Sequence, residues 1–248
     1  MKESMFEVKD SASFHRLFFL TPEILFYVAL AVGLGAWTLW RAPSVGAALW
    51  PAVTMLVFYP AAEYLLHRYL LHANFLARWQ ATSPLWYRIH YRHHSKPSDQ
   101  SVILAAPYTI LGAVAIIAAV FGLIYGTWIA FTASLAVGNV LIVAYEYAHS
   151  VCHATFPTAN VYLKSIRTSH VLHHFHAEGG NYGITNNLSD RVFGTRYDEK
   201  SLPPRSPTVR NLGYDEEMRR AFPWIAEIEA DANGAFQAET GLKKTGPR

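Results

Sequence analysis

The sequence predicts an all-α integral membrane protein, in which four transmembrane helices carry a cytoplasmic helical cap rich in histidine. Three observations lead to this prediction. Charged residues are rare or missing in two long stretches of the chain, and the basic residues gather on one side of these stretches. Eleven of the twelve histidines lie in two polar segments, about 63–99 and 146–198, that follow the apolar stretches.

Composition excludes several classes of protein. Of the 248 residues, 52% are hydrophobic and only 16% are charged, whereas an average soluble protein has about 25% charged residues. The chain is therefore neither disordered nor a basic nucleic-acid-binding arm. The single cysteine, Cys152, excludes a disulfide scaffold. A net charge of +3 is too small to indicate a polyanionic partner.

The lengths of the apolar stretches indicate how often the chain crosses a membrane. No Asp, Glu, Lys or Arg occurs in the 46 residues of 100–145, and residues 17–62 contain only Glu23 and Arg41. About 20 apolar residues in a helix cross a hydrocarbon core of about 30 Å. Each stretch is therefore long enough for two crossings. The predicted transmembrane helices are about 24–40, 45–62, 103–124 and 128–145.

The distribution of basic residues predicts the orientation. The two short turns on one side of the membrane hold only Arg41, whereas the other side collects nearly all remaining lysines and arginines. By the positive-inside rule, both termini and both polar segments are cytoplasmic. The predicted organisation is a cytoplasmic N-terminal segment (1–22), a membrane-embedded domain (23–198) and a cytoplasmic C-terminal tail (199–248). The tail contains a short surface helix that Pro223 interrupts.

The histidines form four clusters with a repeated design. In each polar segment, a pair of histidines follows a transmembrane helix, and an HxxHH cluster lies farther along the chain. The pairs are His67 with His72 and His149 with His153, and the HxxHH clusters are His90, His93 and His94, and His170, His173 and His174.

Helical spacing predicts that these clusters bind metal. Residues three or four apart share one face of a helix, so each HxxHH cluster, and the pair His149 and His153, can direct its imidazoles to one point. His67 and His72 are five apart, which requires either two different metals or a locally distorted turn. Ten imidazoles exceed what one ion can bind, so we expect two metal ions. A charge patch or a pH sensor would not need four clusters on one membrane face. His15 lies outside the pattern, and we expect it to be structural.

Several residues near the clusters are candidates for orienting the ligands by hydrogen bonds. Glu63 and Glu146 each precede a histidine pair by three or four residues, but they could also be charges at the membrane boundary. Asn187 and Asp190 follow the last cluster, where such residues often shape turns. His176 is either a further hydrogen-bond donor or a surface residue.

Aromatic residues between the first pair and the first HxxHH cluster predict contact with the membrane interface. Trp79, Trp86, Tyr87 and Tyr91 lie in this segment. Tryptophan and tyrosine are enriched where lipid headgroups meet water. We therefore expect these side chains to form an interfacial belt or a lid.

The four clusters resemble the histidine boxes of the fatty acid hydroxylase superfamily, which includes sterol desaturases, sterol methyl oxidases and carotenoid hydroxylases. The resemblance covers about residues 50–198. The spacing is most similar to that of fatty acid 2-hydroxylases, as is the segment 181–195, NYGITNNLSDRVFGT.

The resemblance implies a membrane di-iron oxygenase whose ten cluster histidines are the metal ligands, with no catalytic residue beyond the two metals. Two irons would activate O2 with two external electrons and oxidise a C–H bond of a membrane lipid. Zinc could occupy the site in a purified sample, but it has no redox chemistry. Eukaryotic 2-hydroxylases often carry a fused cytochrome b5 domain with a His-Pro-Gly-Gly motif, which this sequence lacks. We therefore expect a separate electron donor that is cytochrome b5-, ferredoxin- or reductase-like.

Three functions follow as hypotheses. The first is hydroxylation of a fatty acyl chain. The second is hydroxylation or desaturation of a sterol or carotenoid. The same site can yield either an alcohol or a double bond. The third is a membrane metal transporter or sensor. A transporter needs ionisable residues within the bilayer, and the predicted second, third and fourth transmembrane helices have none. The lipid oxygenase hypotheses are therefore favoured.

Overall fold

The computed structural model describes residues 5–97, 99, 102–105 and 107–240, with side chains as far as residue 232. The first residues of the predicted N-terminal segment and the last eight of the predicted tail lie outside this part. The described part contains helices and no strands. Four helices are long and apolar enough to cross a membrane: α2 (Pro22–Arg41), α3 (Val45–Leu66), α6 (Pro107–Tyr125) and α7 (Trp128–His153).

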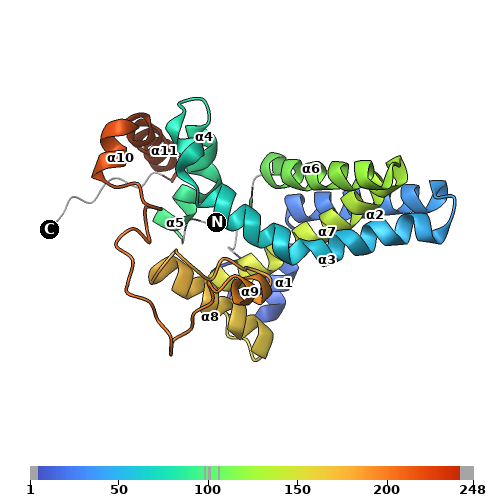
Figure 1. The fold of residues 1–248 in the computed structure, drawn as a ribbon. Coiled ribbons are helices and arrows are strands. Elements are labelled where there is room, and N and C mark those ends of the chain that lie inside the picture. Colours follow the sequence, from blue (N-terminus) through green and yellow to red (C-terminus); the bar gives the residue numbers. More distant parts are fainter. Residues whose placement is uncertain (1–4, 98, 100–101, 106, 241–248) are drawn as a thin grey trace.

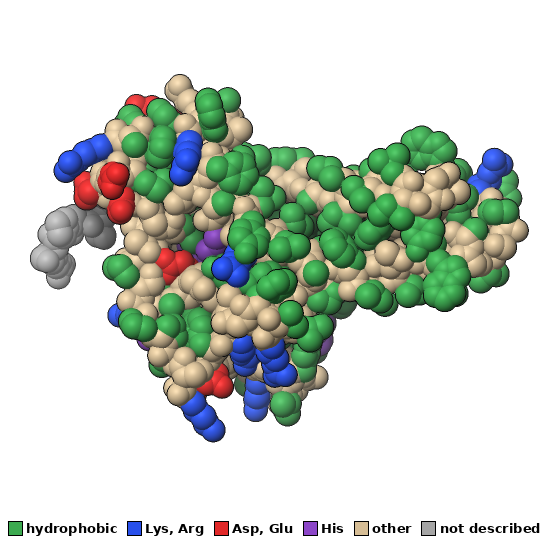
Figure 2. Space-filling view, in the orientation of Figure 1, with side chains coloured by type: hydrophobic (Ala, Val, Ile, Leu, Met, Phe, Trp, Pro, Cys, Tyr) green, Lys and Arg blue, Asp and Glu red, His purple; other side chains and the backbone are tan. Residues whose placement is uncertain are grey.

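These four helices form a rod, and the rest of the chain forms a broader body at one end of it (Figure 1). Hydrophobic side chains cover the surface of the rod, while most acidic and basic side chains lie on the broader body (Figure 2). Leu39, Leu56 and Leu123 are each more than half exposed on the rod. Because a water-facing surface would not display so many large apolar side chains, the rod is the part that lipid surrounds.

The predicted helices agree with the observed ones except at their ends near the histidines. α3 and α7 continue four and eight residues past their predicted ends, so each carries the chain from the membrane directly to a histidine pair. The third predicted helix was placed too early, since α6 begins at Pro107 rather than at residue 103. Ile103 is buried in the turn before α6, and the Glu146 carboxylate accepts a hydrogen bond from the Ala105 amide at 3.0 Å.

Local signals explain where the rod helices begin. The Ser44 hydroxyl accepts a hydrogen bond from an amide in the first turn of α3, and the Thr127 hydroxyl does the same for α7. Gly126 precedes Thr127 with a φ of 68°, a conformation that glycine adopts readily. α7 is the most buried helix of the rod, and it packs against α2, α3 and α6. A hydrogen bond of 2.9 Å between Thr38 and Thr132 joins α2 to α7 within the rod.

Short helices form most of the broader body. We call the cap the described residues from His67 to Ser95 and from His149 to Thr240, so it includes the last turn of α7. Its α-helices are α4 (Ser83–Trp86), α5 (Arg92–Ser95), α8 (Val161–Phe175), α9 (Leu188–Val192), α10 (Glu216–Ala221) and α11 (Trp224–Thr240). Three shorter helical segments complete it: η1 (His67–Leu71), η2 (Asn74–Arg78) and η3 (Tyr87–Tyr91).

The N-terminal helix α1 (Ser11–Phe19) lies beside the cap end of the rod. Phe14 and Phe18 are fully buried in a cluster with Ile24 of α2 and Ile142 of α7. The Asp10 carboxylate caps α1 by accepting a hydrogen bond from the amide of its third residue, Ser13. The segment before α2 is therefore packed onto the rod.

The predicted aromatic belt is wrong for three of its four residues. Trp86, Tyr87 and Tyr91 are at most 3% exposed, and only Trp79 is exposed, at 70%. The three buried rings pack against the tail, whose Leu212, Tyr214 and Ile225 complete an apolar cluster. The tail covers these three rings, so they lie in a core rather than on the surface that was expected. The sequence around the rings does not reveal this contact, because the tail is distant from them along the chain. As predicted, Pro223 separates two tail helices, α10 and α11.

The tail should hold its place through Ile225, which is fully buried against the cap. We expect Ile225→Ala to destabilise this contact by about 2–5 kcal/mol, because the substitution leaves a cavity in a packed cluster. Limited proteolysis in detergent micelles should then cut the tail faster than in the wild type. Glu227→Ala, at an exposed position on the same helix, is the control and should be cut at the wild-type rate.

Candidate metal centre

The ten cluster histidines converge in the cap as two groups. The first histidine group contains His67, His72, His90, His94 and His173, and the second histidine group contains His93, His149, His153, His170 and His174. Within each group, one ring nitrogen from every member lies within 4.8 Å of the others. Eight of the ten side chains are buried, and His72 and His153 are half-buried. Five imidazoles that share one point are the arrangement expected of a metal site.

A distorted turn brings His67 and His72 into the same group. η1 is a π-helical turn in which the His72 amide donates to the His67 carbonyl, five residues earlier, at 3.1 Å. This hydrogen bond places residues five apart on one face, and the two rings stand 4.9 Å apart. Of the two alternatives that the spacing left open, the distorted turn is the one observed. A second π-helical turn, η3, precedes His93 and His94.

Each HxxHH cluster is divided between the two groups, contrary to the prediction that each would point to one place. His90 and His94 join the first group while His93 joins the second, and the other cluster divides with His173 in the first group. Consecutive residues on an α-helix diverge by about 100°, so His93 and His94 cannot face the same point. Each HxxHH cluster therefore gives two histidines to one group and one histidine to the other. The two groups lie side by side, and the ring centroids of His94 and His174 are 4.2 Å apart.

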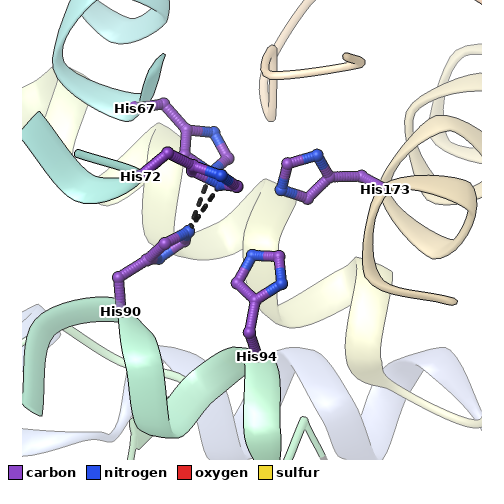
Figure 3. Close-up of side chains that lie close together, drawn as sticks. All are labelled: His67, His72, His90, His94 and His173. Atoms are coloured by element: carbon purple, nitrogen blue, oxygen red, sulfur yellow. Dashed lines mark hydrogen bonds between the residues drawn. The ribbon is translucent and has the colours of Figure 1, made fainter. Parts of the chain in front are cut away.

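The rings of the first group point toward a common centre (Figure 3). The Nε2 atoms of His67, His72 and His90 form a triangle with sides of 2.9–3.2 Å. Nitrogen ligands about 2.1 Å from one ion, at right angles to each other, stand about 3.0 Å apart. The observed spacing therefore suits atoms that coordinate a single ion.

Backbone carbonyls fix three rings of the first group in the orientation that a metal needs. The Nδ1–H groups of His67, His94 and His173 donate to the carbonyls of residues 182, 209 and 180, respectively. Each Nε2 is then a lone-pair acceptor that faces the centre. The Nε2 atoms of His94 and His173 are buried and have no hydrogen-bond partner. A buried acceptor without a partner is costly, and a metal ion would satisfy both.

The second histidine group has the same character. The Nε2 atoms of His93 and His149 are 2.9 Å apart, as are those of His153 and His170. Both ring nitrogens of His174 are buried without a hydrogen-bond partner. The residues present in both groups therefore fit a metal ion by donor type, spacing and unsatisfied lone pairs.

Burial keeps the cap histidines neutral. It lowers the pKa of His173 to about 4, and it lowers the pKa of His90 and His94 well below the usual value of 6.5. Desolvation is the largest cause in each case, because a charged imidazolium loses its hydration in the interior. Neutral imidazole is the form that binds a metal, so these side chains are available as ligands at pH 7.

Asp190 supports the first group through the backbone. Its carboxylate accepts hydrogen bonds from the amides of Tyr182 and Gly183 at 2.9 and 2.7 Å, and the Tyr182 carbonyl in turn accepts from His67. Glu63 holds the next two residues, Ile184 and Thr185, by accepting from both amides. Both acids therefore hold the segment whose Tyr182 carbonyl receives the hydrogen bond of His67, and neither hydrogen-bonds to an imidazole.

The remaining candidates lie farther from the groups. The Glu146 carboxylate binds the turn before α6, and its second oxygen is buried without a partner. His176 donates to the Pro203 carbonyl at 2.7 Å and belongs to neither group. Asn187 lies 3.5 Å from the Ser165 hydroxyl and precedes α9. His15 pairs with the Tyr147 hydroxyl at 2.9 Å, as expected of a structural histidine.

Sequence reasoning missed the carbonyls of Tyr182, Gly180 and Val209, which receive the ligand rings. No side-chain pattern announces a backbone acceptor. One indirect signal was available at Gly180, where a Cβ would collide with the Thr195 carbonyl. Glycine is required there because two backbone segments approach closely.

A cavity of about 480 Å³ leads from the rod to the histidines. α3, α6 and α7 line it with apolar side chains, and His67, His90, His93 and His149 line it at the cap. It thus touches members of both histidine groups. Tyr108, in the first turn of α6, also lines the cavity and is 66% exposed, so the cavity reaches the lipid-facing surface near the cap.

A comparison with protein families agrees with this geometry. The model of the family described as fatty acid hydroxylase matches residues 52–195, which include all ten histidines. The chain belongs to the fatty acid hydroxylase family. The region that matches the family model covers more than half of this chain.

Curated relatives of this family member come from plants and animals. The chain is 32% identical over 166 residues to a dihydroceramide fatty acyl 2-hydroxylase of Arabidopsis thaliana, covering 64% of this chain and 67% of the relative. It is 28% identical over 194 residues to the fatty acid 2-hydroxylase of Rattus norvegicus, covering 77% and 46%. A second Arabidopsis thaliana dihydroceramide fatty acyl 2-hydroxylase is 30% identical over 146 residues, covering 58% and 59%. The chain thus spans about half to two thirds of the length of these relatives.

A solved structure shares the fold. The protein scs7p, determined at full length with only its hydroxylase domain visible, aligns with a TM-score of 0.55 at 20% sequence identity. The alignment covers 82% of this chain and 71% of that one. The similarity supports the arrangement of a helical rod and a cap.

The division of the HxxHH clusters can be tested by metal content. His93→Ala and His94→Ala should each lower bound metal from two ions per chain to about one, and the double variant should lose both, because the two residues serve different groups. Inductively coupled plasma mass spectrometry of the purified protein measures this. His176→Ala is the control and should keep the wild-type content. A double variant that still binds one ion would contradict the division.

Asp190 should control metal affinity without being a ligand. Asp190→Ala removes the acceptor that holds the 182–183 backbone, so we expect metal affinity to fall about 10- to 100-fold. Competition with a chelator of known affinity measures the change. Asp198→Ala, whose carboxylate binds only exposed groups, is the matched control. Equal affinities in the two variants would show that Asp190 does not position His67.

Proposed function

We propose that this protein hydroxylates a fatty acyl chain of a membrane lipid with O2, at a pair of iron ions held by the two histidine groups. The observation that carries this proposal is the apolar cavity, because it joins the lipid-facing rod to members of both groups. A metal transporter would need a polar route through the rod. The cavity walls within the rod are instead mostly apolar, as a hydrocarbon substrate requires.

The depth of the cavity suits an acyl chain. Met55 is its lining residue on α3 farthest from His67, twelve residues away, which is about 18 Å along a helix. On α7 the corresponding span, from Gly138 to His149, is eleven residues or about 16 Å. One leaflet of a bilayer is about 15 Å of hydrocarbon. An acyl chain can therefore leave its leaflet and lie in the cavity with one end at the metals.

Five imidazole nitrogens in each group would hold each ion and leave room for O2. Iron is the proposed metal because imidazole suits it and because the reaction needs redox chemistry, which zinc lacks. When bound, the iron pair supplies the activation of O2 that allows an oxygen atom to enter a C–H bond. Each turnover consumes one O2, two electrons and two protons, and it yields the alcohol and one water.

The protein's own residues prepare the site. Burial keeps the ligand imidazoles of the cap in the neutral form. Backbone carbonyls hold three of these rings with Nε2 toward the centre. The apolar walls exclude water from the substrate, so oxidation is directed to the bound chain rather than to solvent. Pre-formed positions of this kind reduce the cost of binding metal and substrate.

The proposal also includes the placement of the protein in the cell. Basic residues concentrate on the cap side of the rod (Figure 2), which supports a cytoplasmic cap and cytoplasmic termini. Electrons would then come from a separate cytoplasmic donor that is cytochrome b5-, ferredoxin- or reductase-like. In this view residues 23–198 are the catalytic domain, flanked by a cytoplasmic segment and a cytoplasmic tail.

The activity can be tested with purified protein reconstituted with iron. With an electron donor, 18O2 and a fatty acyl lipid in vesicles, we expect an acyl product that carries one 18O atom, detected by lipid mass spectrometry. The His94→Ala variant should lose at least about 100-fold in rate, because the first group would no longer hold its metal.

Parallel reactions with a sterol and with a carotenoid distinguish the other substrate classes of the family. Oxidation of either one, with the acyl lipid unchanged, would contradict the proposal. Transport of metal ions across the vesicle membrane, without any oxidised lipid, would do so as well. Zinc-loaded protein should give no product.

A further inference from the structure

We propose that Met55, together with Val114 and Gly138, forms the floor of the apolar cavity and thereby limits the length of the acyl chain that the protein accepts. The inference rests on the proposed function, since it takes the occupant of the cavity to be an acyl chain. It adds a specificity determinant that lies within the rod, far from the histidines.

Three helices line the deep end of the cavity. Met55 is the lining residue of α3 that is farthest from the cap, and Gly138 has the same place on α7. α6 runs in the opposite direction, away from the cap, and its deepest lining residues are Ile116 and Ile117. Val114 lies about one turn nearer the cap, beside Gly138, and both Val114 and Ile117 pack against the cluster that contains Met55. The cavity therefore ends within the rod where these three helices meet.

Close packing closes the cavity at this level. Met55 is 3% exposed and belongs to an apolar cluster with Phe121 and Leu141, against which Val114 packs. Phe121 does not line the cavity and lies one turn of α6 beyond Ile117.

Gly138 is the second reason why the floor is tight. A Cβ at this position would collide with the Val114 side chain and would lie 3.1 Å from the Met55 Cε atom. Glycine thus allows α7 to approach both neighbours closely enough for their side chains to meet across the cavity. The Met55 side chain is the part of this floor that a small substitution can remove.

A closed floor makes chain length a determinant of binding. Each methylene that the cavity buries improves binding by about fourfold, so affinity should rise with length until the terminal methyl reaches Met55. A longer chain would have to overpack the floor or leave its far end outside the site, and affinity should then fall by about tenfold or more. The wild-type protein should therefore show an optimum in acyl length.

The experiment compares the full chain with three variants. Met55→Ala removes the volume of about two to three methylenes and should move the optimum to longer chains by that number. Val114→Phe should move it to shorter chains. Leu56→Ala makes a similar truncation next to Met55 on the lipid-facing side of α3, where the side chain is 56% exposed, and should leave the optimum unchanged.

Two measurements are made on each variant. Displacement of a bound fluorescent fatty acid by saturated fatty acids of increasing length measures binding without any metal. Turnover of acyl lipids of the same lengths, followed by mass spectrometry, measures the reaction. Both profiles should shift together.

The outcomes separate this inference from the proposed function. The inference that this floor limits acyl length would be contradicted by either of two results. One is wild-type binding that does not depend on chain length, and the other is Met55→Ala and Val114→Phe profiles that coincide with that of the wild type. If Met55→Ala does not insert into membranes, the Val114→Phe profile decides alone. Length-dependent binding with the predicted shifts, but without any oxidised product, would overturn the proposed function and leave the floor supported.

Discussion

The rest of the structure depends on one constraint: ten uncharged imidazoles are packed together where water does not reach most of them. A buried nitrogen lone pair without a partner is costly, and the Nε2 atoms of His94 and His173 have no hydrogen-bond partner. Protonation cannot satisfy them, because burial opposes the charged form. Coordination of a cation can satisfy all of them at once. The cap is therefore organised around two points that attract metal ions.

The membrane helices supply the framework that this constraint requires. α3 and α7 continue without a break from lipid into the cap, so His67 and His149 are fixed by the rod itself. Asp190 and Glu63 then fasten the 182–185 segment against α3, and that segment receives the Nδ1–H of His67. A rigid ligand set and an apolar cavity consequently share the same helices. The proposed site of oxidation can therefore lie beside a long, apolar cavity.

Much of the fold and of the candidate site could be predicted from residue pattern. The four rod helices and the interruption at Pro223 were predicted correctly. The ten histidines singled out by their spacing do lie together in two groups, and His149 and His153 share one of them, as the helical spacing predicts. The partition of the HxxHH clusters was predicted wrongly, since His93 and His94 diverge into different groups. The π-helical turn at His67 stayed an open alternative, because spacing alone cannot state whether a helix is distorted.

Hydrophobic length and the positions of histidine by themselves determined that the chain has four helices long and apolar enough to cross a membrane, and that its histidines concentrate at one end of them. These features follow from local rules, in which about 20 apolar residues span a bilayer and residues four apart share a helix face. Only the tertiary structure decided which histidines meet, which carbonyls orient them, and that Trp86 faces the tail rather than lipid. Such contacts join residues distant in sequence, so they depend on how the helices pack and not on the pattern within any one of them.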